Sequence, residues 1–216
     1  MERIKILKTD YKIKNYSQCM GQNPKIIDKI IIHHSAFFQT TDLQTACKHI
    51  EQAHLNRGYS AIGYHFLIGK NGDIAYGRPI NYIGAHCKNY NNHSVGICLI
   101  GNFEEEKPTS EQYQSLGLLI KHLRTYFINS QAKIYPHKIL NTTLCPGKNF
   151  LIDKLNKILL GGNKKMLESA NDIIWELSQH YNISNVDKAV ADLEKAKNED
   201  SSCYWLLKKI ANGEEK

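Results

Sequence analysis

The sequence predicts an α/β protein with a central mixed β-sheet flanked by helices, followed by a small all-α domain. Over residues 1–162, short apolar runs with strand character are interleaved with amphipathic segments. An Asn-Gly step between two of these runs indicates a hairpin. After Gly161-Gly162-Asn163, apolar residues recur only at helical spacing. We therefore expect two domains, at residues 1–162 and 163–216.

The strands are predicted from runs of apolar and β-branched residues bounded by turn formers. In chain order they are expected at residues 26–33, 62–68, 73–77, 94–101 and 132–135. The segment Gly69-Lys70-Asn71-Gly72 joins the second and third.

Three helices are predicted around this sheet. The first is expected to be capped by Thr40 or Thr41, to run to Arg57 and to stop at Gly58. The second opens with a capping box, in which Thr109 is followed three residues later by Gln112. Its apolar stripe is Tyr113, Leu116, Leu119, Ile120, Leu123 and Phe127. The third is expected at about residues 149–160.

Composition narrows the classes of protein to consider. The chain has 216 residues, 42% of them hydrophobic and 23% charged, which is ordinary for a globular protein. No apolar run reaches the ~18 residues of a membrane span. The first residues lack an apolar signal core and a cleavage site, so we expect a protein that is cytoplasmic as synthesised. Six scattered cysteines without a CxxC pair are expected to be reduced thiols.

The formal net charge of +7 favours an anionic partner, such as nucleic acid, a membrane surface or an acidic wall polymer. No basic run interleaved with aromatic residues is present, so a nucleic-acid partner is not expected.

The residues with the clearest chemistry are potential metal ligands. His33 and His34 end an apolar run, and His137 and Cys145 follow about a hundred residues later. Imidazole and thiolate ligands suit zinc, and three protein ligands would leave a fourth position for water. Ligand types alone do not decide the set, because ten histidines and six cysteines allow accidental pairings.

The order of motifs resembles a known family. Ile-Ile-His-His-Ser-Ala is followed by Gly63-Tyr64-His65-Phe66, Gly77-Arg78-Pro79, Gly84-Ala85-His86, Asn91-Asn92-His93-Ser94-Val95-Gly96 and Cys145-Pro146-Gly147. Over about residues 26–160 this order resembles the zinc-dependent N-acetylmuramoyl-L-alanine amidases, a superfamily that includes amidase-type phage lysozymes and peptidoglycan recognition proteins.

The resemblance implies roles for individual residues. It makes His33, His137 and Cys145 the zinc ligands. His34 lies on the opposite side of a strand from His33 and is expected to be a packed or hydrogen-bonded neighbour. Tyr64 matches the tyrosine beside the zinc-bound water in active members, although it could be a strand aromatic in the core.

Further residues come from the same resemblance. Thr143 stands where phage lysozymes commonly carry lysine, and its hydroxyl could donate one neutral hydrogen bond to an oxyanion. His86 and Asn92 fall in segments that line the substrate groove of the family, with a purely scaffolding role as the alternative. Its position near the end of the first predicted helix, and not the resemblance, indicates that His54 is a core or capping histidine. Period two would put Tyr64 on the same strand face as Phe66 and Ile68.

The function that the resemblance implies is zinc-dependent hydrolysis of the amide between N-acetylmuramic acid and L-alanine in peptidoglycan or muropeptides. The expected setting is a phage or prophage endolysin. The alternatives are a cytoplasmic muropeptide-recycling amidase and a non-catalytic peptidoglycan-binding protein of the same fold. A further alternative is a zinc-stabilised protein whose basic helical tail binds a protein or nucleic-acid partner. Residues 163–216 are expected to form a wall-binding or oligomerisation module, so a homo-oligomer is possible.

Overall fold

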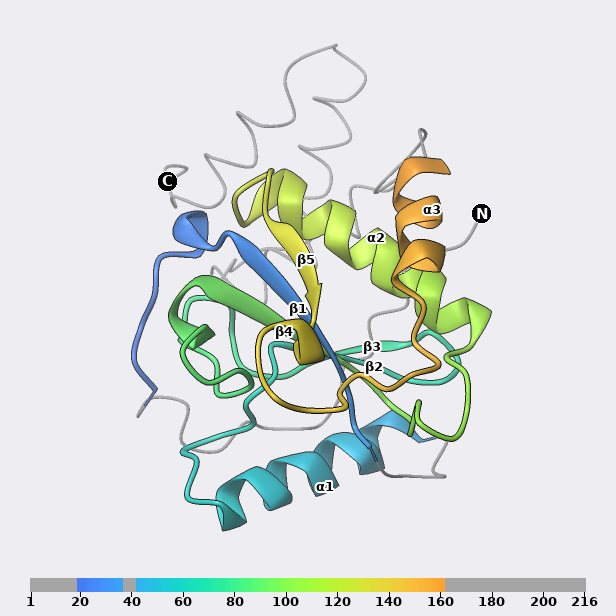
Figure 1. Ribbon diagram of the computed structural model, residues 1–216. Coiled ribbons are helices and arrows are strands. Elements are labelled where there is room, and N and C mark those ends of the chain that lie inside the picture. Colours follow the sequence, from blue (N-terminus) through green and yellow to red (C-terminus); the bar gives the residue numbers. More distant parts are fainter. Residues whose placement is uncertain (1–18, 37–41, 162–216) are drawn as a thin grey trace, which may run out of the picture. The chain divides into compact units, whose positions relative to one another are not determined.

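The computed structural model describes residues 19–36 and 42–161 (Figure 1). The predicted helical domain at 163–216, and the predicted caps Thr40 and Thr41, lie outside these ranges. The helices and strands are β1 (Lys29–His34), α1 (Leu43–Asn56), β2 (Phe66–Ile68), β3 (Ile74–Tyr76), β4 (Ser94–Leu99), α2 (Ser110–Tyr126), β5 (Lys133–Pro136) and α3 (Ile152–Gly161). Three short 3-10 helices accompany them. Two precede strands, η2 (Pro24–Ile26) before β1 and η3 (Asn91–His93) before β4, and η4 (His137–Ile139) directly follows β5.

The five strands form one mixed sheet in the order β3-β2-β4-β1-β5. Strand β1 pairs in parallel with β4 on one side and with β5 on the other. Strand β2 also pairs in parallel with β4. Only β3 runs antiparallel, to β2, through the hairpin predicted at the Asn-Gly step. The predicted mixed α/β sheet is therefore confirmed.

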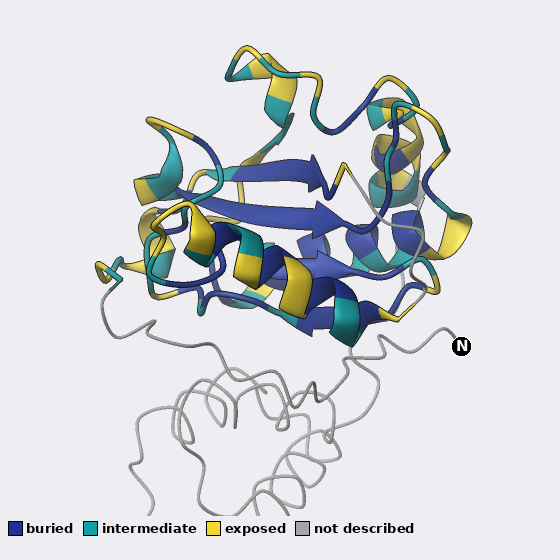
Figure 2. Cartoon of the chain, turned by 90° about the horizontal axis from the view of Figure 1, so that it is seen from below, coloured by how far each residue is buried: buried dark blue, intermediate teal, exposed yellow. Residues whose placement is uncertain are grey.

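Helices cover both faces of the sheet, with α1 on one side and α2 and α3 on the other (Figure 1). Two apolar clusters mark the two faces. The α2 cluster includes Ile30, Ile32, Phe66 and the helix stripe from Tyr113 to Phe127. The α1 cluster includes Leu67, Cys98 and the inner residues of α1. Figure 2 shows the inner strands β1, β2 and β4 buried along nearly all of their length, while the helices keep exposed outer sides. The edge strand β5 is only partly buried. Parallel strands buried on both faces explain why the isoleucine run of β1 shows no apolar–polar alternation.

Helix α1 begins one or two residues later than the predicted caps, Thr40 or Thr41, would place it. Its N-cap is Asp42, whose carboxylate accepts hydrogen bonds from the backbone N–H groups of Gln44 and Thr45. A carboxylate at this position satisfies two amides of the first turn and interacts favourably with the helix dipole. The helix ends at Asn56, one residue before the predicted end, with Arg57 as its C-cap. Gly58 follows in the left-handed region at φ 83°.

Helix α2 confirms the predicted capping box. The Thr109 hydroxyl accepts the Gln112 N–H, and the Gln112 side chain accepts the Thr109 N–H. The Gln112 amide also donates to Ile68 and Ile100, which fastens the helix to the ends of β2 and β4.

The predicted strand at 62–68 is much shorter in the structure. Only Phe66–Ile68 forms β2, and the residues before it run irregularly. The guanidinium of buried Arg78 donates to the carbonyls of Ala61, Ile62 and Ile83. These carbonyls would otherwise be buried without a ladder partner, so the arginine replaces the missing sheet hydrogen bonds. It also ties the segment carrying Tyr64 to the segment carrying His86.

No helix among residues 19–36 and 42–161 combines the length and the hydropathy needed to cross a bilayer.

Candidate metal centre and active site

His33 reaches the site because β1 alternates its side chains between the two faces of the sheet. Ile30 and Ile32 pack in the α2 cluster, so His33 points to the α1 face, beside Cys98 of β4 in the parallel register. Its side chain is 1% exposed. A histidine so deeply buried needs polar partners to offset the loss of water.

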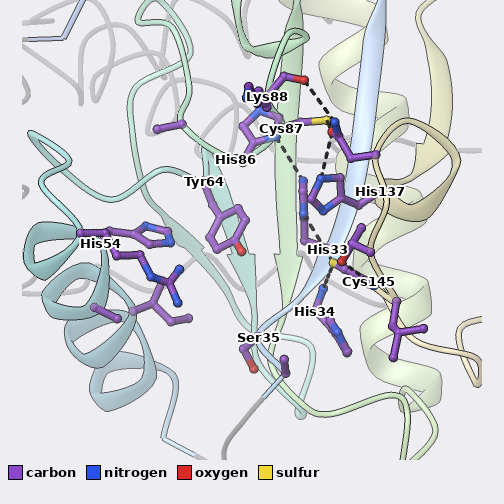
Figure 3. Close-up of a pocket in the computed structure, with 18 of the residues that line it drawn as sticks. His33, His34, Ser35, His54, Tyr64, His86, Cys87, Lys88, His137 and Cys145 are labelled. Carbon is purple, nitrogen blue, oxygen red and sulfur yellow. Dashed lines mark hydrogen bonds between the residues drawn. The ribbon is translucent and has the colours of Figure 1, made fainter.

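His137 and Cys145 arrive from the other side of the site. β5 runs parallel to β1 and ends at Pro136, so η4 begins with His137 at the level where β1 ends. The loop then turns back, and the Lys138 N–H donates to the Cys145 carbonyl at 2.7 Å. One ligand atom from each of His33, His137 and Cys145 lies within 4.8 Å of the others (Figure 3). The three residues are able to hold a metal ion.

The spacing of His33 and Cys145 suits a zinc ion. The His33 Nδ1 lies 3.6 Å from the Cys145 Sγ. Zinc bonds of about 2.0–2.1 Å to nitrogen and 2.3 Å to sulfur, at a tetrahedral angle, would separate these two atoms by about 3.5 Å. The His33 and Cys145 atoms therefore fit zinc without rearrangement, and the two imidazoles and one thiol are donor types that zinc prefers.

His34 is a packed and hydrogen-bonded neighbour of the site, as predicted. Its Nδ1 accepts the Phe103 N–H at 3.1 Å on the opposite face of the strand. Its own backbone N–H donates to the Cys145 Sγ at 3.4 Å. This bond from the main chain favours the thiolate form that a metal requires.

A chain of hydrogen bonds assigns the tautomer of His33. The Ser94 hydroxyl donates to the Tyr90 carbonyl at 2.7 Å, so the Ser94 oxygen accepts from the His86 Nε2, 3.4 Å away. The His86 Nδ1 then carries a lone pair and accepts from the His33 Nε2 at 3.1 Å. The His33 Nδ1 is left with its lone pair facing Cys145, as a metal ligand needs.

Two glycines make room for the His86 ring. A Cβ on Gly96 would lie 2.5 Å from the His86 Cγ, and one on Gly84 would lie 2.6 Å from its Cδ2. A side chain at either position would therefore collide with the ring. His86, predicted to contact substrate, lines the pocket and is also hydrogen-bonded to the candidate ligand His33.

Burial controls the protonation of the three candidate ligands. It lowers the pKa of His33 well below the usual value, with the charge of His137 acting in the same direction. Burial also lowers the pKa of His137. It raises the pKa of Cys145 to about 12, against the opposing hydrogen bond from His34. Both imidazoles are therefore neutral and ready to bind, whereas the thiol must release its proton to a metal.

Tyr64 lies beside the candidate ligands, with its ring centroid 5.1 Å from that of His33. The predicted face was wrong. Tyr64 packs against the α1 cluster, which contains Leu67, whereas Phe66 and Ile68 belong to the α2 cluster. Strict alternation fails because β2 begins only at Phe66. Burial, and then the charges of Cys98 and Cys145, raise the pKa of Tyr64 well above its usual value, so it remains a hydrogen-bond donor.

Thr143 lines the same pocket. Its hydroxyl oxygen accepts the Cys145 N–H at 3.2 Å, which orients the loop around the thiol. The hydroxyl proton does not take part in that bond.

The pocket over these residues has a volume of about 1040 Å³ and is bounded on one side by His54 and Arg57 of α1. Buried His54 accepts the Gly63 N–H through its Nδ1, which matches the expected packing role. Asn91 lines the pocket, and its Oδ1 accepts the N–H groups of His86 and Cys87. Asn92 is exposed and is not among the lining residues, so its contact with substrate stays a prediction.

Residues 22–148 match the sequence profile of the N-acetylmuramoyl-L-alanine amidases, which is more than half of the chain. The chain belongs to this family. The match contains every residue of the candidate metal centre. It ends before α3 and leaves residues 149–216 unassigned.

Relatives of this amidase-family chain come from animals and phages. It is 37% identical to peptidoglycan-recognition protein LB of Drosophila melanogaster over 124 residues, which are 55% of this chain and 53% of that protein. It is 32% identical to the endolysin of Klebsiella phage KP32 over 123 residues, covering 55% of this chain and 79% of the endolysin. The match thus spans about half of the first relative and most of the second.

A solved structure shares the fold. The N-acetylmuramoyl-L-alanine amidase LysC from Clostridium intestinale superposes with a TM-score of 0.58 at 31% identity, over 74% of this chain and 99% of that one.

The sequence analysis did not predict several residues whose hydrogen bonds position the candidate metal centre. Arg78 was noticed only as part of a motif, and Cys87, Ser94 and Asn141 were given no role. Cys87 and Asn141 contact each other across 54 residues of sequence, and Arg78 bonds to carbonyls 16 and 17 residues away. Ser94 bonds to residues only four and eight positions away, in the irregular segment before β4. Residue type alone gave no indication of these contacts.

Proposed function

We propose that the chain is a zinc-dependent N-acetylmuramoyl-L-alanine amidase that hydrolyses the bond between N-acetylmuramic acid and L-alanine in peptidoglycan. The observation that carries the proposal is the meeting of His33, His137 and Cys145 in the pocket of an amidase-family domain. The family, the endolysin relative and the LysC structure support peptidoglycan as the substrate.

Zinc held by these three residues would supply Lewis acidity, which makes a water more acidic and a carbonyl more electrophilic. The chain itself prepares the site for the ion. His33 and His137 are neutral at physiological pH because of their burial, and the His34 N–H stabilises the Cys145 thiolate.

Tyr64 and Thr143 would stabilise the charge that develops on the scissile carbonyl oxygen. The phenol of Tyr64 keeps its proton because of its raised pKa, so it can donate a hydrogen bond. The Thr143 hydroxyl has its proton available while its oxygen accepts from Cys145. Donors placed in advance need no reorganisation during the reaction, and one such donor is worth roughly a hundredfold to a thousandfold in rate.

The test is mass spectrometry of purified peptidoglycan digested by the protein, with a chelator, with zinc added back, and with neither. Zinc-dependent release of free stem peptides with an L-alanine amino terminus is expected. Cleavage of a different bond, or an activity unaffected by complete removal of metal, would overturn the proposal.

A non-catalytic peptidoglycan-binding protein is the main rival, because a peptidoglycan-recognition protein is among the relatives. The complete His-His-Cys set favours catalysis, since a purely binding pocket needs no third metal ligand. Binding of peptidoglycan without release of stem peptide would favour the rival.

The proposed setting is a phage or prophage endolysin that acts on the cell wall, supported by the phage relative and by the positive net charge. A muropeptide-recycling amidase is the alternative. Turnover of intact cell walls compared with soluble anhydro-muropeptides distinguishes them, because an endolysin must work on the insoluble polymer.

Residues 163–216 are proposed to bind the wall or to mediate oligomerisation. Cosedimentation of the full chain and of a chain ending at Gly162 with intact walls tests the first role. Equal retention of both would remove wall binding, and analytical ultracentrifugation of the same pair tests the second.

A further inference from the structure

The side chain of Asn141 is turned toward the candidate metal centre. Its Oδ1 lies 3.3 Å from the His137 Nε2 and 2.8 Å from the Cys87 Sγ. Its Nδ2 lies 3.5 Å from the Lys88 carbonyl oxygen. Figure 3 shows Cys87 and His137 in the same part of the pocket, which agrees with their shared contact to Asn141. Two potential donors therefore converge on one amide oxygen.

These contacts assign the tautomer of His137. The Asn141 amide nitrogen faces a carbonyl, so the nitrogen donates and the Oδ1 is the atom that faces Cys87 and His137. An amide oxygen only accepts, so the His137 Nε2 must carry the hydrogen. The His137 Nδ1 is then left with the lone pair.

The local backbone sets this geometry. After η4, the Asn141 N–H donates to the His137 carbonyl at 3.1 Å, four residues back. That helical turn places the Asn141 side chain on the same side as the His137 ring. To end the turn, Asn141 would need only its backbone hydrogen bond to His137. Its side-chain oxygen and nitrogen nevertheless both have hydrogen-bond partners as well.

We propose that Asn141, oriented by the Cys87 thiol, is a positioning residue that fixes the Nε2–H tautomer of His137 and presents its Nδ1 to the metal. This inference rests on the metal centre of the proposed function. It gives His137 the same arrangement that His86 gives His33, with Nε2 held by an outer partner. Loss of such an outer partner costs about 10- to 100-fold in metal affinity.

The first measurement is the tautomer itself, read from long-range proton–nitrogen correlation spectra of the metal-free protein. The wild-type chain should show His137 as the Nε2–H form, and Asn141→Leu should show a mixture. Asn141→Asp keeps an acceptor oxygen and should retain the Nε2–H form. A pure Nε2–H form in Asn141→Leu would overturn the proposal.

The second measurement is zinc affinity by competition with a chromophoric chelator. Asn141→Leu should bind zinc 10- to 100-fold more weakly, while Asn141→Asp should stay within a few-fold of wild type. Asn56→Leu, the same change at an exposed position of α1, should leave the affinity unchanged. Equal affinity of wild type and Asn141→Leu, or equal loss in both Asn141 variants, would overturn the inference.

Thermal unfolding of the metal-free variants separates positioning from folding. Should Asn141→Leu fail to fold, the pair Cys87→Ser and Cys87→Ala replaces it, because serine keeps a donor toward Asn141 and alanine does not. Weaker zinc binding in Cys87→Ala alone supports the proposal, and identical affinities overturn it. Failure of the wild-type chain to bind zinc would overturn the proposed function together with the inference.

Discussion

The His33 Nδ1 lies 3.6 Å from the Cys145 Sγ, although 112 residues separate the two in sequence. β1 delivers the histidine, and the loop after β5 delivers the cysteine. Because β1 and β5 are parallel neighbours, their carboxyl ends meet at one place on the sheet. The separation of these two atoms is what makes this pocket a candidate metal site.

Replacement of Cys145 by serine should abolish metal binding and activity. A serine hydroxyl stays protonated at neutral pH and is a poor zinc ligand. Metal content by atomic emission after dialysis is expected to fall below one tenth of an equivalent. Cys19→Ser, at a partly exposed thiol that contacts Ser60, should keep a full equivalent. Full zinc occupancy in Cys145→Ser would remove the thiolate from the ligand set.

Replacement of Tyr64 by phenylalanine should leave zinc bound and reduce turnover by about a hundredfold or more, the typical cost of one oxyanion donor. The ring keeps its packing against His33 and His54, so the unfolding temperature should change little. Turnover numbers and metal content are measured on the same samples. Wild-type turnover in this variant would show that Tyr64 only packs.

Gly96→Ala should disturb the metal centre without touching a ligand. The added Cβ would lie 2.5 Å from the His86 ring, which must shift away from His33. We expect about a tenfold loss of zinc affinity, measured by chelator competition. Gly21→Ala is the matched control, because its Cβ would meet nothing closer than 3.8 Å. Equal affinity of both variants would show that the His86 contact does not tune the site.

The metal-free protein should lose stability as the pH falls from about 6.5 to 4. Burial lowers the pKa of His54 and of His65 to about 4, whereas in the unfolded chain both titrate near 6.5. Between these values the unfolded state binds more protons, so acid favours unfolding, by about 3 kcal/mol for each histidine.

Urea unfolding of chelator-treated protein at pH 7 and pH 5 measures this effect. A free energy of unfolding that is the same at both pH values would contradict the assigned burial of His54 and His65.

The sequence predicted what depends on local pattern. The capping box of Thr109 and Gln112, the apolar stripe of α2 and the Asn-Gly hairpin each arise from interactions within a few residues. The Asp42 cap was missed because threonine and aspartate are both good caps, and one residue of offset is not distinguished by pattern. The face of Tyr64 was wrong because the Arg78 bonds replace a strand there, and no periodicity reports a side chain from another segment.

The sequence by itself determined the fold class, the family and the residues able to bind a metal, because these follow from local periodicity and from the order of motifs. Only the tertiary structure decided which atoms of those residues face one another. The position of the lone pair on His33 depends on His86, which is itself oriented by Ser94. The position of the lone pair on His137 depends on Asn141, which contacts Cys87. A tautomer is set by partners in space, and folding alone brings those partners together.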